Sequence, residues 1–138
     1  MLCEISLTVS ESKRLIAKGV AAMPAVKKAL AEGTVAIATG STNAYVVEEV
    51  TGRPIEKNKY MTGATLPEGV SREGLLSREV ADVVLKNGKP VENVTVSEAV
   101  QDMGIGDVFM KGANALHYES GTAGLLIVRG QVMMLKNR

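Results

Sequence analysis

An apolar segment that leads into a polar glycine turn constrains the fold of this chain more than any other feature. Residues 34–39 read TVAIAT, with threonines at the two ends and only apolar side chains between them. This pattern is typical of a strand that is covered on both faces of a sheet. Gly40, Ser41 and Thr42 follow, and residues 44–50 then place alanine and valine at helical spacing. The expected unit is a central strand, a turn and a helix, as in α/β proteins.

The turn itself offers candidate ligand-binding groups, namely Thr39, Gly40, Ser41, Thr42 and Asn43. A helix that begins near Asn43 leaves backbone amides without intrahelical acceptors, and its dipole favours a negative charge at that end. Gly40 would let a ligand approach the backbone closely. In an open α/β sheet such a turn lies at the carboxyl end of a strand, where ligands usually bind. The alternative is that Ser41 or Thr42 only caps the helix.

The first third of the chain predicts a strand and a divided helix. Leu2–Val9 is rich in β-forming residues, and we expect Cys3 to be buried in this strand. Residues 11–32 then have helical periodicity, which Pro24 should kink or divide, and Gly33 suits a left-handed C-terminal cap. The expected buried face of this helix comprises Leu15, Ile16, Val20, Met23, Val26 and Leu30.

The remaining segments predict further alternation of strands and helices. Asn87-Gly88 indicates a type I′ hairpin turn between apolar segments, whereas the proline and glycine residues of 53–78 indicate a long irregular connection. The other expected elements are a helix that begins at Thr95 or Ser97 and ends at Met103, a strand over Asp107–Met110, a loop over 111–122, and a terminal strand pair over 124–128 and 131–135.

These elements predict one α/β domain over residues 1–138. We expect three layers, with a mostly parallel sheet, helices on both of its faces and an antiparallel terminal strand pair. A chain of 138 residues that is 46% apolar is long enough for one substantial core.

Composition and charge argue against several classes of function. The formal net charge is +1, and no basic run suggests nucleic-acid binding. No apolar run approaches the roughly 20 residues of a membrane span, so we expect a cytoplasmic protein. One histidine and one cysteine cannot supply a usual zinc site. Gly104-Ile105-Gly106 precedes a strand instead of following one, so no nicotinamide cofactor is indicated. We expect neither a metal nor another cofactor.

A second polar segment, residues 111–122, carries the remaining candidate groups. Glu119 is the best carboxylate for proton transfer or nucleophilic attack, since a loop between apolar strands can partly shield it from water. The alternative is an exposed loop carboxylate. Asn114 could orient an oxyanion through its side-chain amide, or it could only shape a turn. His117 is two residues from Glu119 and is either a general base or an exposed side chain.

Both segments resemble known phosphate- and thioester-handling proteins. Residues 38–49, ATGSTNAYVVEE, resemble the phosphate loop of ribose-5-phosphate isomerases and, more loosely, of glucosamine-6-phosphate deaminases. Residues 111–119, KGANALHYE, are similar to the Lys-Gly-Gly-Gly run of these isomerases, which a catalytic glutamate follows. Glu119-Ser120-Gly121 resembles the Glu-Asn-Gly of acyl-CoA transferases, and with Thr122 it resembles lactate-utilisation domains. All four groups belong to one superfamily of isomerase and CoA-transferase-like folds.

The resemblance implies a division of roles within a single site. Lys111 and Glu119 would be the catalytic residues, with the Lys111 ammonium near a substrate phosphate or enolate oxygen. The alternative for Lys111 is a solvated lysine at the end of a strand. The turn Thr39–Asn43 would bind the anionic group of the substrate. Further substrate-binding candidates are Gly112, Asn114, Gly121 and Thr122. The paired acidic residues of the isomerases' Asp-Gly-Ala-Asp segment have no counterpart between Thr51 and Lys111.

Three functions follow from these patterns. The first is an enzyme that acts on a phosphorylated sugar or an acyl-CoA-type metabolite by carboxylate-mediated proton transfer. The second is a non-catalytic ligand-sensing module of the same fold, which has kept the anion turn and lacks the acidic pair. The third is an assembly domain in which the motifs are structural. In the first two the partner is a small anionic metabolite, and because the chain is short for this superfamily, we expect a homo-oligomer to complete the site.

Overall fold

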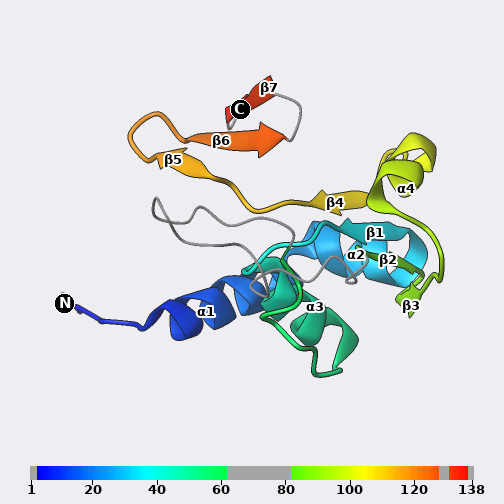
Figure 1. Ribbon diagram of the computed structural model, residues 1–138, viewed down its shortest axis with the longest axis horizontal. Helices are drawn as coiled ribbons and strands as arrows, with labels where there is room; N and C mark the ends of the chain where they lie inside the picture. The colour runs from blue at the N-terminus through cyan, green and yellow to red at the C-terminus, as the bar shows by residue number, and fades with distance from the viewer. Residues whose placement is uncertain (1–2, 62–81, 128–130, 137–138) are drawn as a thin grey trace, which may run out of the picture.

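Four helices and seven strands, arranged in two sheets, make up the part of the chain that the structure describes (Figure 1). The computed structural model describes residues 3–61, 82–127 and 131–136. The helices are α1 (Val9–Ala22), α2 (Pro24–Glu32), α3 (Asn43–Thr51) and α4 (Val96–Asp102). The strands are β1 (Thr34–Ile37), β2 (Val83–Lys86), β3 (Lys89–Pro90), β4 (Val108–Met110), β5 (Ala115–His117), β6 (Thr122–Ile127) and β7 (Gln131–Lys136).

The larger sheet has the strand order β3-β2-β1-β4, with β1 inside it as expected. β1 pairs in parallel with β4 and antiparallel with β2, and β2 pairs antiparallel with β3. The chain is therefore an α/β protein with a mixed sheet, and the prediction of mostly parallel pairing is wrong. The single parallel pair in the described sheet brings the carboxyl ends of β1 and β4 to the same edge.

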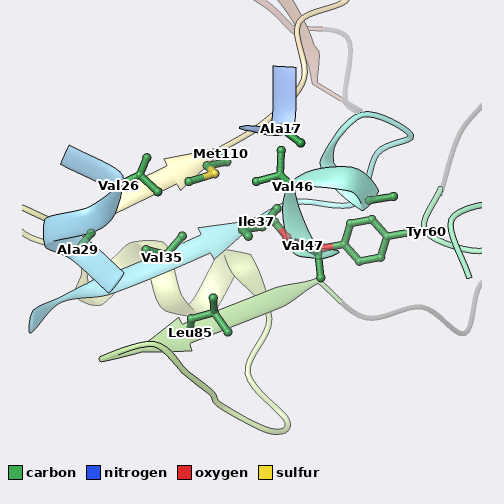
Figure 2. Packing of buried hydrophobic residues seen from close by; sticks show 11 residues of the cluster. Ala17, Val26, Ala29, Val35, Ile37, Val46, Val47, Tyr60, Leu85 and Met110 are labelled. Atoms are coloured by element: carbon green, nitrogen blue, oxygen red, sulfur yellow. Dashed lines mark hydrogen bonds between the residues drawn. The ribbon is translucent and has the colours of Figure 1, made fainter. Parts of the chain in front are cut away.

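Helices pack on both faces of β1, as its continuous apolarity predicted. Val35 and Ile37 face a core formed with α1, α2 and α3, whereas Ala36 faces α4. Val35, Ile37 and Leu85 are fully buried, and each contributes roughly 1.5–3 kcal/mol through its burial. The rest of the first core, most of it visible in Figure 2, comprises Ala17, Val26, Ala29, Ala44, Val46, Val47, Tyr60 and Met110.

The expected first strand is not formed. Residues 3–8 are exposed and belong to neither sheet, and α1 already begins at Val9. Thr8 caps α1 through a reciprocal pair of hydrogen bonds with Glu11, so the helix begins two residues before the predicted start at residue 11. Cys3 is exposed, and the prediction of a buried thiol is wrong.

The predicted division at Pro24 is confirmed, because Pro24 is the first residue of α2. The predicted buried face of the divided helix is partly right. Val26 is buried and Val20 and Leu30 pack against the core, whereas Leu15, Ile16 and Met23 are exposed and Ala17 is buried instead. α1 packs on α3, and the ion pairs of Arg14 and Lys18 lie between the two helices.

Gly33 ends α2 for a different reason from the one expected. Its φ and ψ of −140° and −158° are extended, not left-handed. A Cβ at this position would lie 2.8 Å from Oδ1 of Asp107. That oxygen accepts a hydrogen bond from the Thr34 amide, at the start of β1. Gly33 is thus needed to let Asp107 reach the backbone.

The predicted hairpin turn at Asn87-Gly88 is confirmed, although its second strand is Lys89–Pro90 and not the apolar segment 91–96. Asn87 and Gly88 have φ of 49° and 73°, as a type I′ turn requires. β3 is only two residues long and includes Pro90, which has no amide to donate to a sheet. The predicted helix that follows is α4, and Thr95 caps it together with Glu98.

The second sheet contains β5, β6 and β7 in antiparallel order. β6 and β7 confirm the predicted terminal strand pair, while β5 lies within the segment predicted as a loop. In Figure 1 this sheet lies beyond β4, the edge strand of the larger sheet. Of the expected irregular connection, residues 53–61 contain no helix or strand, and 62–78 lie outside the described residues.

Candidate functional site

Three elements meet at the turn that follows β1. β1 and β4 run parallel, with Ile37 beside Met110 at their carboxyl ends. The Ala38 amide continues this pairing by donating to the Met110 carbonyl oxygen at 3.0 Å. α3 begins at Asn43, only five residues after Ala38. The turn Thr39–Asn43 therefore joins the ends of two parallel strands to the N-terminus of a helix, where ligands of α/β proteins usually bind.

The Asn43 side chain holds these elements together. It is 5% exposed, and its Nδ2 donates to the carbonyl oxygens of Ala38 and Met110 at 2.8 and 3.3 Å. Both donors of the amide group are thus used by the backbone. Asn43 can contribute its backbone amide to a ligand, whereas its side chain has a structural role.

The backbone amides of the turn fall into two groups. Those of Thr39 and Gly40 are occupied, because they donate to Oδ1 of Asp82 and to the Tyr60 carbonyl oxygen, both at 2.9 Å. Within the described residues, the amides of Ser41, Thr42 and Asn43 have no acceptor. Such amides, at the positive end of the helix dipole, favour an anion.

Capping by a hydroxyl group, the alternative explanation of this turn, is not observed. Thr42 is the N-cap residue of α3, yet its backbone is helical (φ −79°, ψ −41°) and its side chain makes no capping hydrogen bond. Ser41 uses its hydroxyl differently, as the acceptor of a hydrogen bond from Lys13. The amides at the start of α3 are therefore not satisfied by either side chain.

Lys13 is a member of the site that the sequence did not reveal. Its Nζ lies 3.0 Å from Oγ of Ser41, so α1 places a cation next to the amides without acceptors. The two residues are 28 positions apart and are brought together by packing between α1 and α3. The sequence motif gives no signal of this contact, because it depends on which face of α1 meets α3.

An ion-pair network fixes α1 against α3. Arg14 contacts Glu48 and Glu49, and Glu48 also binds Lys57. The Lys57 ammonium, followed by the Arg14 guanidinium, lowers the pKa of Glu48 to about 2. The Tyr45 ring lies 4.9 Å from the Arg14 guanidinium and 5.1 Å from the Lys57 ammonium, close enough for cation–π attraction to both. The network holds the segment that carries Lys13.

Tyr60 and Asp82 support the other side of the turn. The Tyr60 hydroxyl donates to the Ile37 carbonyl oxygen at 2.8 Å (Figure 2), and it accepts from the Val83 amide at 3.2 Å. Burial raises the pKa of the Tyr60 phenol, so it stays a donor. Besides binding Thr39, Asp82 accepts from the Val96 amide at 3.4 Å through Oδ2. Asp82 thus ties the turn to the start of α4 and puts a negative charge near Thr39.

The structure places Lys111 at the same edge of the sheet as the turn. Lys111 directly follows Met110, the last residue of β4, and is partly buried. Gly112 and Asn114 come next and are exposed. The Asn114 amide donates to the Gly124 carbonyl oxygen at 2.9 Å, so Asn114 belongs to the base of the β5–β6 hairpin.

The other predicted site residues form the turn between β5 and β6. Glu119 is exposed there, which agrees with the alternative of an exposed loop carboxylate and not with a partly shielded one. His117 Nδ1 lies 2.8 Å from Oγ of Ser120 and accepts from the Ser120 amide at 3.3 Å. Gly121 completes the turn, and the buried Thr122 accepts from the Ser120 hydroxyl at 2.8 Å. Among the described residues, no hydrogen bond or ion pair joins this turn to Thr39–Asn43.

Comparisons with protein-family models, with curated proteins and with solved structures found no match to the chain. The described helices include none that is both long and apolar enough to cross a membrane. In the same residues no group of three or more histidine, cysteine, aspartate and glutamate side chains is arranged to hold a metal ion.

Proposed function

We propose that the protein binds a small anionic metabolite at the turn Thr39–Asn43, and that a phosphate group is the anion. The observation that carries this proposal is the run of three amides, Ser41 to Asn43, without acceptors at the start of α3. A phosphate offers several oxygens to neighbouring amides, and the dipole of α3 adds attraction. The ligand would contact the Ser41 end of the turn, because the amides at the Thr39 end already have acceptors.

The wider proposal is an enzyme of the isomerase and CoA-transferase-like superfamily. A phosphorylated sugar or an acyl-CoA-type metabolite would bind with its phosphate at the turn and its reacting carbon toward Lys111. Lys111 would stabilise a developing oxyanion, and Glu119 would move the proton. Glu119 is exposed in the β5–β6 turn, so a rearrangement of that hairpin or a second copy in a homo-oligomer would shield it from water for this role.

Ligand sensing without turnover is the second candidate. The exposure of Glu119 favours it, because an exposed carboxylate is not shielded from water as a carbon base requires. The anion turn does not depend on Glu119, so binding would persist without catalysis.

Binding is tested by nuclear magnetic resonance titration of the labelled protein with inorganic phosphate, ribose 5-phosphate and acetyl-CoA. We expect the amide signals of Ser41, Thr42 and Asn43 to shift most. Thr42→Asp adds a carboxylate at the N-cap, where it stabilises a helix but repels an anion. This variant should keep its stability and lose binding, while Thr42→Asn, a neutral cap, should retain both. Absence of shifts with all three ligands would contradict the proposal.

Turnover is tested separately. An enzyme that abstracts a proton from carbon should exchange the substrate hydrogen with deuterium in heavy water, and Glu119→Gln should abolish this exchange while binding persists. Asp102→Asn, a change to another exposed carboxylate, serves as the control. Binding of ribose 5-phosphate or acetyl-CoA by the wild type without exchange would favour the sensing module.

A further inference from the structure

Lys13 is a cation of the site whose charge is not balanced by a carboxylate among the described residues. Its neighbours on α1 are paired, Arg14 with Glu48 and Glu49 and Lys18 with Glu49. In the described part of the chain Lys13 forms no ion pair, and its ammonium donates to the neutral hydroxyl of Ser41 at 3.0 Å. The full charge of Lys13 is therefore available to a ligand at the turn.

The placement of Lys13 is fixed by elements other than the turn. The Arg14 and Lys18 ion pairs hold α1 on α3, and Ala17 is fully buried between them and the core. Lys13 is partly buried on the same side of α1. Its ammonium is thus presented to the turn by a packed helix, in contrast to a lysine on a free loop.

The charges at the two ends of the turn have opposite signs. Asp82 binds the Thr39 amide at one end, and Lys13 contacts Ser41 at the other. Amides and the helix dipole attract any anion, but the Asp82 carboxylate repels it. A full positive charge at the Ser41 end offsets this repulsion, and its attraction for a ligand is proportional to the ligand's charge.

We propose that Lys13 determines the charge specificity of the site, by selecting doubly charged phosphate monoesters over singly charged phosphate diesters. This inference rests on the proposed function and names the ligand class of the same site. Lys13 is a binding residue in this proposal and takes no part in chemistry. A lysine ammonium suits this role, because it acts as a compact point charge on phosphate.

The probes are methyl phosphate and dimethyl phosphate at pH 8. A phosphate monoester has its second ionisation near pH 6, so methyl phosphate is a dianion under these conditions and dimethyl phosphate is a monoanion. Both are titrated into the full chain, with the amide signals of Ser41 to Asn43 as the readout. The variants are Lys13→Gln, the charge-keeping Lys13→Arg, and Lys27→Gln, which removes one charge from an exposed position on α2.

We expect the wild type to prefer methyl phosphate and Lys13→Gln to lose roughly tenfold or more in affinity for it, as for a lost charge-assisted hydrogen bond. The loss of affinity for dimethyl phosphate should be several-fold smaller, so Lys13→Gln should bind the two probes with more nearly equal affinity. Lys13→Arg should keep the preference, and Lys27→Gln should resemble the wild type. An unchanged preference in Lys13→Gln overturns this inference but leaves the anion site intact. If the wild type binds neither methyl phosphate nor dimethyl phosphate, both the proposed function and this inference are wrong.

Discussion

The side-chain amide of Asn43 lies 3.3 Å from the carbonyl oxygen of Met110, and so joins the first residue of α3 to the last residue of β4. The same amide group donates to Ala38 at the end of β1. One buried side chain therefore sets the positions of the three elements from which the candidate site is built.

Asn43→Ala should lower the free energy of unfolding by about 2–3 kcal/mol, because two buried carbonyl oxygens would lose a donor. Urea denaturation measures the change. Asn58→Ala, at an exposed turn position, is the matched control and should stay within about 0.5 kcal/mol of the wild type. Equal effects of the two substitutions would show that the Asn43 side chain does not hold the site together.

Gly33→Ala and Gly19→Ala should change stability in opposite directions. A Cβ at Gly33 would meet Asp107 Oδ1 at 2.8 Å, whereas at Gly19, within α1, it meets nothing within 4 Å. Gly33→Ala should destabilise the fold by about 1–3 kcal/mol through this clash. Gly19→Ala should stabilise it by up to about 1 kcal/mol through helix propensity. Thermal unfolding of both variants checks the pair, and a neutral Gly33→Ala would disprove the steric role given to Gly33.

Glu48 should make the fold sensitive to acid. Its pKa is about 2 in the folded protein, compared with an ordinary value of 4.5. A carboxylate whose folded pKa is lowered stabilises the fold above its unfolded pKa, and this contribution is lost as the pH falls through the folded pKa. The stability difference between the wild type and Glu48→Gln should therefore shrink between about pH 4.5 and pH 2.

Chemical denaturation at several pH values measures this difference. The variant Glu32→Gln provides the control, since Glu32 is exposed and, among the described residues, forms an ion pair with Lys28 alone. Its difference from the wild type should change little over the same range. A Glu48→Gln difference that is constant with pH would mean that Arg14 and Lys57 do not hold Glu48 as described.

Asp82→Asn should strengthen anion binding. The substitution keeps an oxygen that can accept from the Thr39 amide and removes the negative charge near the turn. A Coulomb interaction over several ångströms at an intermediate dielectric corresponds to a gain of roughly threefold to tenfold in affinity for methyl phosphate. Asp102→Asn changes the net charge equally at an exposed position outside the turn and should have little effect. A fall in the affinity for methyl phosphate with Asp82→Asn would contradict this prediction. It would show that the Asp82 carboxylate favours binding, by shaping the turn, more than it opposes binding by repulsion.

The sequence predicted the parts of this fold that depend on local chemistry. Pro24 divides the long helix, Asn87 and Gly88 form the hairpin turn, and the polar turn leads from β1 into α3. In each case the residue that carries the signal also determines the backbone geometry. The same holds for Thr95, which caps α4.

Features that depend on packing between distant segments could not be predicted. The apolar stripe of α1, with Leu15 and Ile16, is exposed because Arg14 and Lys18 bind α3 instead. Alternation alone made residues 2–9 resemble a strand, although the described segment 3–8 has no strand partner. In the candidate site, the turn and Lys111 were predicted from motifs. The contribution of Lys13, and the use of the Asn43 side chain as a clamp, follow only from the three-dimensional arrangement.

The place of β1 within the larger sheet has a consequence for how the chain folds. Both of its partners, β2 and β4, come from the second half of the sequence, and the Thr34 amide finds its acceptor Asp107 at a separation of 73 residues. Closing loops of this size costs entropy before any pairing is gained, so such sheets form slowly. During synthesis, the sheet edge that bears the candidate site therefore cannot form until β4 has been translated and can pair with β1. Refolding should therefore be limited by this long-range pairing.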